Sequence, residues 1–185
     1  MTEDNLNFKF GIPGPKPTAY HYPKHFEIEP NRLVIGLQEN ALEVINLLKQ
    51  ILPEPFAILY VLNVPRDDEI HTGRYQSPWL THTELNEFLT TFQSFIEGDA
   101  RHEIWVYSEP SNTQIVYDFH NLIYYYSPDL NPAILSLKSI GFSPGKVEIP
   151  FPHIHPYHPH FDPTLADLMN YFDWNFTRHP EDHEP

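Results

Sequence analysis

The stretch that decides the fold is residues 101–127, RHEIWVYSEPSNTQIVYDFHNLIYYYS. It contains three short runs rich in β-branched and aromatic residues, and turn residues separate the runs. The first separator, Glu109-Pro110-Ser111-Asn112, suits a type I turn because the fixed φ of proline fits the second turn position. The pattern predicts a three-stranded antiparallel meander over about residues 102–126.

Alternation along these runs predicts how the sheet is covered. Successive side chains of a strand point to opposite faces, so Ile104 and Val106 lie opposite Glu103, Trp105 and Tyr107. One face is therefore strongly apolar, and the other mixes aromatic rings with polar groups. We expect helices to cover the apolar face and to leave the second face partly exposed.

Outside the meander, four helices and three further strands are expected. Asn40 with Glu43 and Thr81 with Glu84 have the spacing of a helix N-cap and its capping-box partner, and two other helices start with proline in the first turn. The expected helices cover residues 40–52, 81–97, 131–140 and 162–172, the expected strands cover 32–37, 56–62 and 146–149, and the polar segment 63–79 reads as an exposed loop. This order predicts an α+β domain with a mixed or mostly antiparallel sheet and helices mainly on one face.

The chain length favours one domain with its own core. Five prolines in residues 1–30 exclude a regular helix and predict an extended N-terminal arm. We expect residues 31–176 to form the α+β domain, including a histidine- and proline-rich strap at 150–163, and residues 177–185 to be a disordered tail.

Composition narrows the classes of function. The 25 acidic and 11 basic side chains give a net charge of −14, which opposes nucleic-acid binding and favours a basic protein partner. The absence of cysteine excludes thiolate metal sites and cysteine nucleophiles. No segment has the length and apolarity of a signal peptide or a membrane span, so a cytoplasmic protein without a membrane partner is expected.

The first hypothesis is an acidic protein-binding module without a cofactor. Large aromatic side chains dominate interface energetics, and nearby carboxylates steer a basic partner. The candidate anchors are Trp79, Trp105, Tyr107, Tyr125 and Trp174, and the candidate steering residues are Asp67, Asp68, Glu69, Glu103 and Asp118.

The layout of residues 81–150 is a helix, the runs HEIWVYS, TQIVYDFHN and LIYYYS, then a helix and a short strand. This layout resembles that of small α+β proteins that are encoded beside polymorphic toxins and are presumed to be immunity proteins. The resemblance implies a neutralising function with a basic toxin as the partner. It carries over no catalytic residues.

The alternative hypothesis is a metal-binding protein or metal-dependent enzyme that uses the strap. In extended geometry His153 and His155 share one face, as do His158, His160 and Asp162, because the side-chain period is two. Imidazoles with a carboxylate form a ligand set suited to Zn or Fe(II). Packing of the strap over the sheet explains the same residues without a metal, and the sequence favours binding over catalysis.

A second polar group lies near the meander. Asp99 and Arg101 precede its first strand, and Asp118 and His120 flank its second turn. One interpretation is a polar cluster at one end of the sheet. The sequence favours local ion pairing and turn capping instead, because the two positions need not meet at the same end of the sheet.

Overall fold

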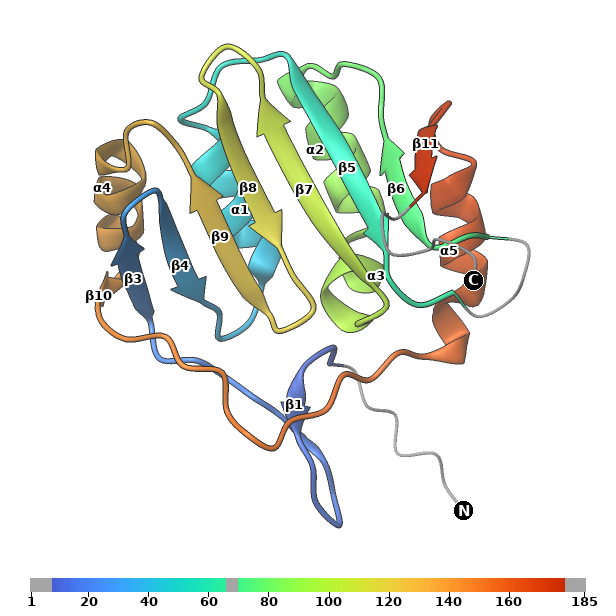
Figure 1. Cartoon of the computed structure of the whole chain (residues 1–185), viewed down its shortest axis with the longest axis horizontal. Helices are drawn as coiled ribbons and strands as arrows, with labels where there is room; N and C mark the ends of the chain where they lie inside the picture. The colour runs from blue at the N-terminus through green and yellow to red at the C-terminus, as the bar shows by residue number, and fades with distance from the viewer. Residues whose placement is uncertain (1–7, 66–69, 179–185) are drawn as a thin grey trace.

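The computed structural model describes residues 8–65 and 70–178 and forms a single α+β domain (Figure 1). Nine strands form one sheet in the order β10-β3-β4-β9-β8-β7-β5-β6-β11. All neighbours pair antiparallel except β10 with β3. The strands of this sheet are β3 (His25–Glu29), β4 (Arg32–Gly36), β5 (Phe56–Leu62), β6 (Gly73–Gln76), β7 (His102–Ser108), β8 (Thr113–Tyr117), β9 (Leu122–Tyr126), β10 (Ser143–Pro144) and β11 (Asn175–Arg178).

The predicted meander is confirmed as β7, β8 and β9. Trp105 lies opposite Val116, which lies opposite Tyr124, so the three strands are in register. The β7–β8 turn is closed by a 3.2 Å hydrogen bond from the Asn112 N–H to the Glu109 carbonyl. Asn112 and Asn121 adopt positive φ values of 47° and 61°, a conformation that asparagine tolerates better than most residues.

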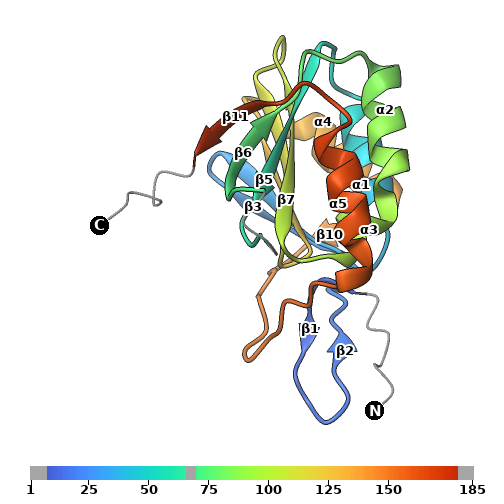
Figure 2. The same cartoon turned by 90° about the vertical axis from the view of Figure 1, so that its right-hand side faces the viewer.

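The helices cover one face of the sheet, as expected (Figure 2). They are α1 (Ala41–Lys49), α2 (His82–Thr91), α3 (Gln93–Gly98), α4 (Asn131–Ser139) and α5 (Asp162–Met169), with a short 3-10 helix, η1 (Pro159–Phe161), before α5. The expected helix over residues 81–97 is divided into α2 and α3 at Phe92. Its capping box between Thr81 and Glu84 is present.

The expected cap of α1 is wrong. Asn40 has a left-handed backbone and its side chain makes no cap hydrogen bond. The Glu97 carboxylate on α3 instead accepts from the Leu42 N–H at 2.9 Å. A residue distant in sequence therefore satisfies one of the free N–H groups of this helix.

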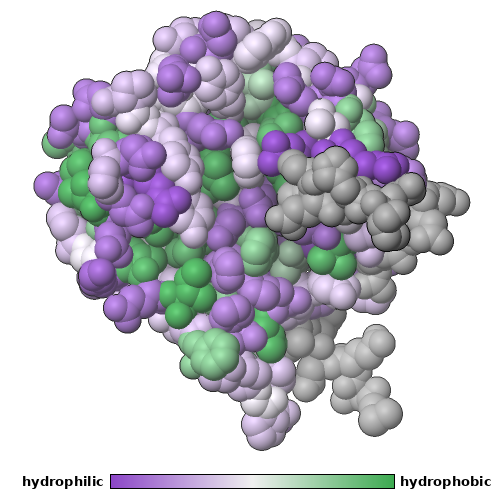
Figure 3. All heavy atoms as spheres, viewed as in Figure 1, coloured by the Kyte–Doolittle hydropathy of each residue, from purple (hydrophilic) through white to green (hydrophobic). Residues whose placement is uncertain are grey.

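The main core lies between the helices and the inward face of the sheet. On the meander, the core residues are Ile104, Val106, Ile115, Tyr117, Ile123 and Tyr125, and all of them are buried. The outward face of the meander carries Trp105, Tyr107, Val116, Tyr124 and Tyr126. Figure 3 views this open face, on which hydrophobic and hydrophilic side chains lie side by side.

Several boundaries differ from the expectation. β6 falls inside the segment 63–79 that was expected to be a loop, and β3 falls inside the expected arm. The strand expected at 146–149 is wrong, and β10 precedes that position. β11 contains Thr177 and Arg178 of the expected tail, and the rest of that tail lies outside the described residues.

The N-terminal arm packs on the domain. It forms a two-stranded antiparallel sheet from β1 (Gly11–Ile12) and β2 (Thr18–Ala19). Phe10 and Tyr22 are buried in a small second core with Val34 and Leu122. No helix of the described residues is long and apolar enough to cross a membrane.

Candidate metal centre

Three parts of the chain meet at one end of the sheet. They are the β8–β9 turn, the strap at 150–163 and the start of the arm at β1 (Figure 1). The start of β7 lies at this same end, because Ile104 pairs with Tyr117 in an antiparallel ladder. The polar residues before β7, Asp99 and Arg101, and those of the β8–β9 turn, Asp118 and His120, therefore lie at the same end of the sheet.

His120 is held rigidly in the β8–β9 turn. The Asp118 carboxylate accepts from the backbone N–H groups of His120 and Leu122, each at 2.9 Å. Its second oxygen lies 3.0 Å from Nδ1 of the His120 ring. Asp118 therefore fixes the turn and orients the imidazole at the same time.

His153 and His155 lie on the strap and approach His120 from across the sheet end. Between them, Ile154 pairs with Gly11 through two backbone hydrogen bonds, of 3.1 and 2.9 Å. Nδ1 of His153 lies 2.8 Å from the Pro150 carbonyl, and Nδ1 of His155 lies 3.1 Å from the Phe119 carbonyl. The extended strap thus places both rings on the same side, as the period of two predicts.

The three imidazoles form a compact cluster. One ligand nitrogen from each of His120, His153 and His155 lies within 4.8 Å of the other two. The ring centroids of the three pairs are 4.8 to 5.4 Å apart. Nitrogens bound to one tetrahedral zinc at about 2.0–2.1 Å stand roughly 3.4 Å apart, so modest ring movements bring all three into coordination range.

The hydrogen bonds determine which nitrogen is free to bind a metal. A carbonyl or carboxylate oxygen only accepts, so each Nδ1 that lies against one carries the proton. The lone pair of each neutral ring is then on Nε2. Metal-binding histidines show the same arrangement, with the second ring nitrogen donating to a carboxylate or carbonyl.

Aromatic side chains enclose the cluster. The Phe10 ring lies 5.5 to 5.6 Å from all three imidazoles, and the Phe119 ring contacts His120 and His155. Burial, together with the neighbouring His120, lowers the pKa of His155 to about 4. His155 is therefore neutral near pH 7, as a metal ligand must be.

Of the strap residues named as candidate ligands, His158, His160 and Asp162 do not join this cluster. The His158 N–H donates to Asp99 at 2.9 Å, and its ring faces the Phe8 carbonyl. His160 is exposed and stacks on His158. Pro156 lies between the two groups of histidines, and Pro159 begins the short helix η1 between His158 and His160.

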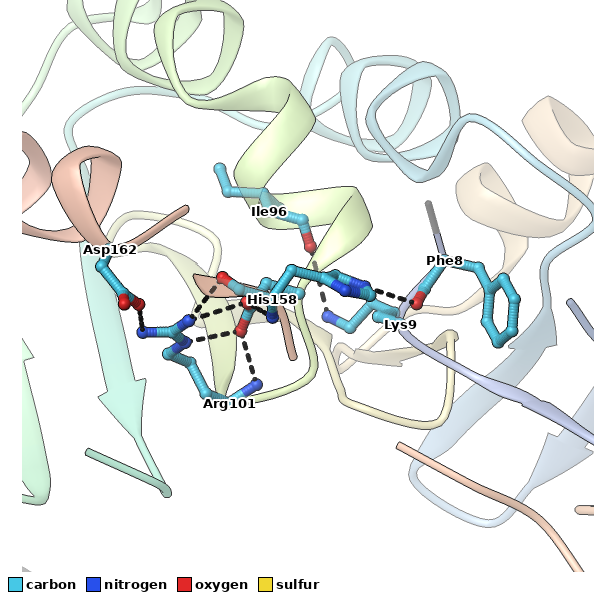
Figure 4. A network of polar contacts seen from close by, with 7 residues as sticks. Phe8, Lys9, Ile96, Arg101, His158 and Asp162 are labelled. Carbon is cyan, nitrogen blue, oxygen red and sulfur yellow. Dashed lines mark hydrogen bonds and ion pairs between the residues drawn. The ribbon is translucent and has the colours of Figure 1, made fainter. Parts of the chain in front are cut away.

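Asp162 belongs to an ion-pair network around Arg101 (Figure 4). The fully buried Arg101 guanidinium donates to both oxygens of Asp99, at 2.8 and 3.1 Å, and to Asp162 at 2.9 Å. It also donates to the His158 carbonyl at 3.1 Å. The network ties the strap to the body of the domain and so supports the position of His153 and His155.

The candidate binding residues are not gathered in one place. Trp105, Tyr107, Glu103 and Asp118 lie on or beside the open face of the meander, whereas Trp79 is 54% exposed on the segment between β6 and α2. Trp174 packs against the main core and donates to the Leu168 carbonyl. Asp67, Asp68 and Glu69 lie outside the described residues.

The expectation for Tyr125 is wrong. It is 1% exposed, because it follows Ile123 on the inward face of β9 and lies under the helices. It cannot contact a partner without unfolding of the core.

His120 is the candidate ligand that the sequence analysis assigned to turn capping. The sequence does contain a pattern that indicates this role. Asp118, two residues earlier, is the kind of carboxylate that orients a metal-binding histidine. Its proximity to the strap depends on the fold of the whole chain.

Comparison with known proteins identifies no relative, since no family model, curated protein or solved structure matches the chain.

Proposed function

We propose that this protein binds a transition-metal ion, of the zinc or iron(II) class, through His120, His153 and His155. The observation that carries the proposal is that the three rings are held in the same way. Nδ1 of each ring lies against an oxygen acceptor of the protein. A proton on each Nδ1 leaves the Nε2 lone pair of each ring available, and the three rings lie close enough for one nitrogen of each to be within 4.8 Å of the others.

The ligand chemistry narrows the choice of metal. Neutral imidazoles suit zinc, copper, iron and nickel, whereas calcium and magnesium prefer oxygen ligands. Three protein ligands are typical of catalytic zinc sites, in which the fourth position is left for water or substrate, whereas structural zinc sites have four. The proposal is therefore a site that holds the ion and leaves room for one more ligand.

Elemental analysis of untagged protein, purified without chelators, is the first test. We expect about one equivalent of metal per chain, lost after dialysis against EDTA and restored by added zinc. His153→Ala and His120→Ala should each abolish stoichiometric binding measured by calorimetry. His160→Ala is the matched control, because it removes an exposed histidine from the same strap without touching the cluster.

Two outcomes would contradict the proposal. One is that His120→Ala binds metal as tightly as the unmodified protein. The other is that His160→Ala weakens binding as much as His153→Ala, which would place the metal on the strap in general. Circular dichroism of each variant separates loss of the site from loss of the fold.

Asp118 offers a finer test of the same site. Asp118→Asn retains an oxygen for the turn but removes the charge that holds the His120 ring. Loss of such a supporting carboxylate typically lowers metal affinity by about 10- to 100-fold. We expect a loss of this size by competition with a chromogenic chelator, and unchanged affinity would show that Asp118 serves the turn alone.

A further inference from the structure

A groove runs over β8 on the open face of the sheet, and its form follows from the register of the meander. Val116 and Gln114 of β8 form its floor. Trp105 of β7 stands on one side, and Tyr124 and Tyr126 of β9 stand on the other. The groove has a volume of about 370 Å³ and reaches the β8–β9 turn.

The charged groups of the groove are carboxylates. Glu103 and Asp118 line it, and no lysine or arginine from the described ranges 8–65 and 70–178 does so. Glu103 also accepts from Trp105 Nε1 at 2.8 Å and so orients one wall of the groove. The chain as a whole carries a net charge of −14, which adds a long-range attraction for cations.

The protein's own arginines show which chemical group the walls accept. The Arg32 guanidinium lies over Tyr124, 4.9 Å from the ring centroid, and donates to the Tyr126 hydroxyl at 2.7 Å. The Arg74 guanidinium lies 5.8 Å from the Trp105 ring centroid. In the strand order, Arg32 on β4 and Arg74 on β6 are on the outer sides of the two walls. The space between the walls has the same aromatic chemistry and no cation of the described residues.

We propose that this groove binds an arginine side chain of a basic protein partner. The guanidinium stacks between Trp105 and the tyrosines of β9, and the carboxylates of Glu103 and Asp118 offset its charge. Arginine fits better than lysine because its planar group stacks on aromatic rings and its weaker hydration lowers the desolvation cost. The groove shares Asp118 and His120 with the proposed metal site, so its binding is tested with the metal removed.

The test uses a fluorescein-labelled nona-arginine peptide as the probe, with binding measured by anisotropy at 0.15 M salt in the presence of EDTA. Nona-lysine and nona-glutamate are the comparison peptides. We expect binding of nona-arginine that is tighter than binding of nona-lysine, and no binding of nona-glutamate. Equal affinities for the two basic peptides would overturn the stacking that defines the proposal.

Two matched pairs of variants distinguish binding of the peptide in the groove from its non-specific electrostatic attraction to an acidic protein. Gln114→Arg places a cation on the floor of the groove, whereas Gln50→Arg makes the same change at an exposed position at the end of α1, among the helices on the other face of the sheet. Glu103→Gln removes a groove carboxylate, whereas Glu87→Gln removes an exposed carboxylate on α2. Charges more than about 8 Å away are largely screened at this salt concentration, so the control variants should bind almost normally.

We expect Gln114→Arg to weaken binding at least about 10-fold, the scale of an interface hot spot. Glu103→Gln should weaken it by a smaller factor and does not introduce a bulky side chain, so it also tests the proposal if Gln114→Arg folds poorly. Equal effects within each pair would overturn the proposal. Size-exclusion chromatography provides a separate test, because a dimer that Gln114→Arg dissociates would show that a second copy of the chain occupies this face.

Discussion

Arg101 and Asp99 form a buried ion pair whose partners are both fully buried. Asp99→Asn leaves the buried guanidinium paired with Asp162, whose side chain is 43% exposed, and loss of one charge from a buried pair typically costs about 3–5 kcal/mol. We therefore expect Asp99→Asn to lower the free energy of unfolding by this amount in urea denaturation. Glu29→Gln, which breaks the partly exposed pair with Arg32, should cost less than about 1 kcal/mol. Similar losses for both variants would show that the Arg101 network has no special role.

Lys9 gives a prediction for the dependence of stability on pH. It is buried, with its ammonium group bonded to the Ile96 carbonyl and placed over the Tyr117 ring, and burial lowers its pKa from 10.5 to about 8. Between these two values the unfolded chain binds more protons than the folded chain. The contribution of Lys9 to the free energy of unfolding therefore rises with pH, by up to about 1.4 kcal/mol per pH unit.

The measurement is urea denaturation of the unmodified protein and of Lys9→Met at pH 7, 8, 9 and 10. Subtracting the free energy of unfolding of Lys9→Met from that of the unmodified protein removes the contribution of tyrosines that titrate in the same pH range. We expect the stability of the unmodified protein relative to the variant to increase from pH 8 upward. A difference that does not vary with pH would mean that Lys9 has an ordinary pKa in the folded protein.

Local signals predicted the elements that depend on neighbouring residues. The capping box of Thr81 and Glu84 and the proline in the first turn of α4 both lie where the sequence indicates. The alternating meander also lies where expected. By contrast, α1 takes an N-terminal partner from Glu97, and β10 pairs with β3 from more than a hundred residues away. No local pattern encodes such partners.

β1 and the strap are coupled through one glycine, which gives a prediction at the scale of the element. Gly11 pairs with Ile154, the residue between His153 and His155. A Cβ at Gly11 would lie 2.3 Å from the Thr18 carbonyl, so the backbone must shift. At Gly14 the nearest atom would be 3.8 Å away, an ordinary contact.

We therefore expect Gly11→Ala to displace the strap and to weaken metal binding at least about 10-fold, the lower end of the range for altered ligand support. Gly14→Ala should leave the affinity unchanged. Calorimetric titration with zinc compares the two variants directly. Unchanged affinity in Gly11→Ala would show that the strap holds its histidines without the arm.

The whole molecule explains why the candidate centre could be predicted only in part. The shared face of His153 and His155 follows from the period of an extended chain, and the structure places them together. His120 joins them because the strap, after α4, returns along the sheet end and is fixed there by Arg101. Phe10 completes the enclosure from the other end of the sequence. These contacts are set by topology, which a single sequence does not reveal.

Because the proposed ligands come from two distant segments, an ion bound by them should stabilise the folded state as a whole. Folding brings the β8–β9 turn and the strap together, so an ion that bridges His120 with His153 and His155 binds the folded chain in preference to the unfolded chain. At a free zinc concentration of 100 times Kd, this linkage adds about 2.7 kcal/mol. For a chain of this size, such a gain raises Tm by roughly 5–10 °C.

Thermal unfolding followed by circular dichroism, with zinc and with EDTA, measures the shift. The shift should persist in His160→Ala and disappear in His153→Ala. An equal shift in His153→Ala would mean that zinc stabilises the protein from another position, and a lower Tm with zinc would mean that it binds the histidine-rich unfolded chain more tightly.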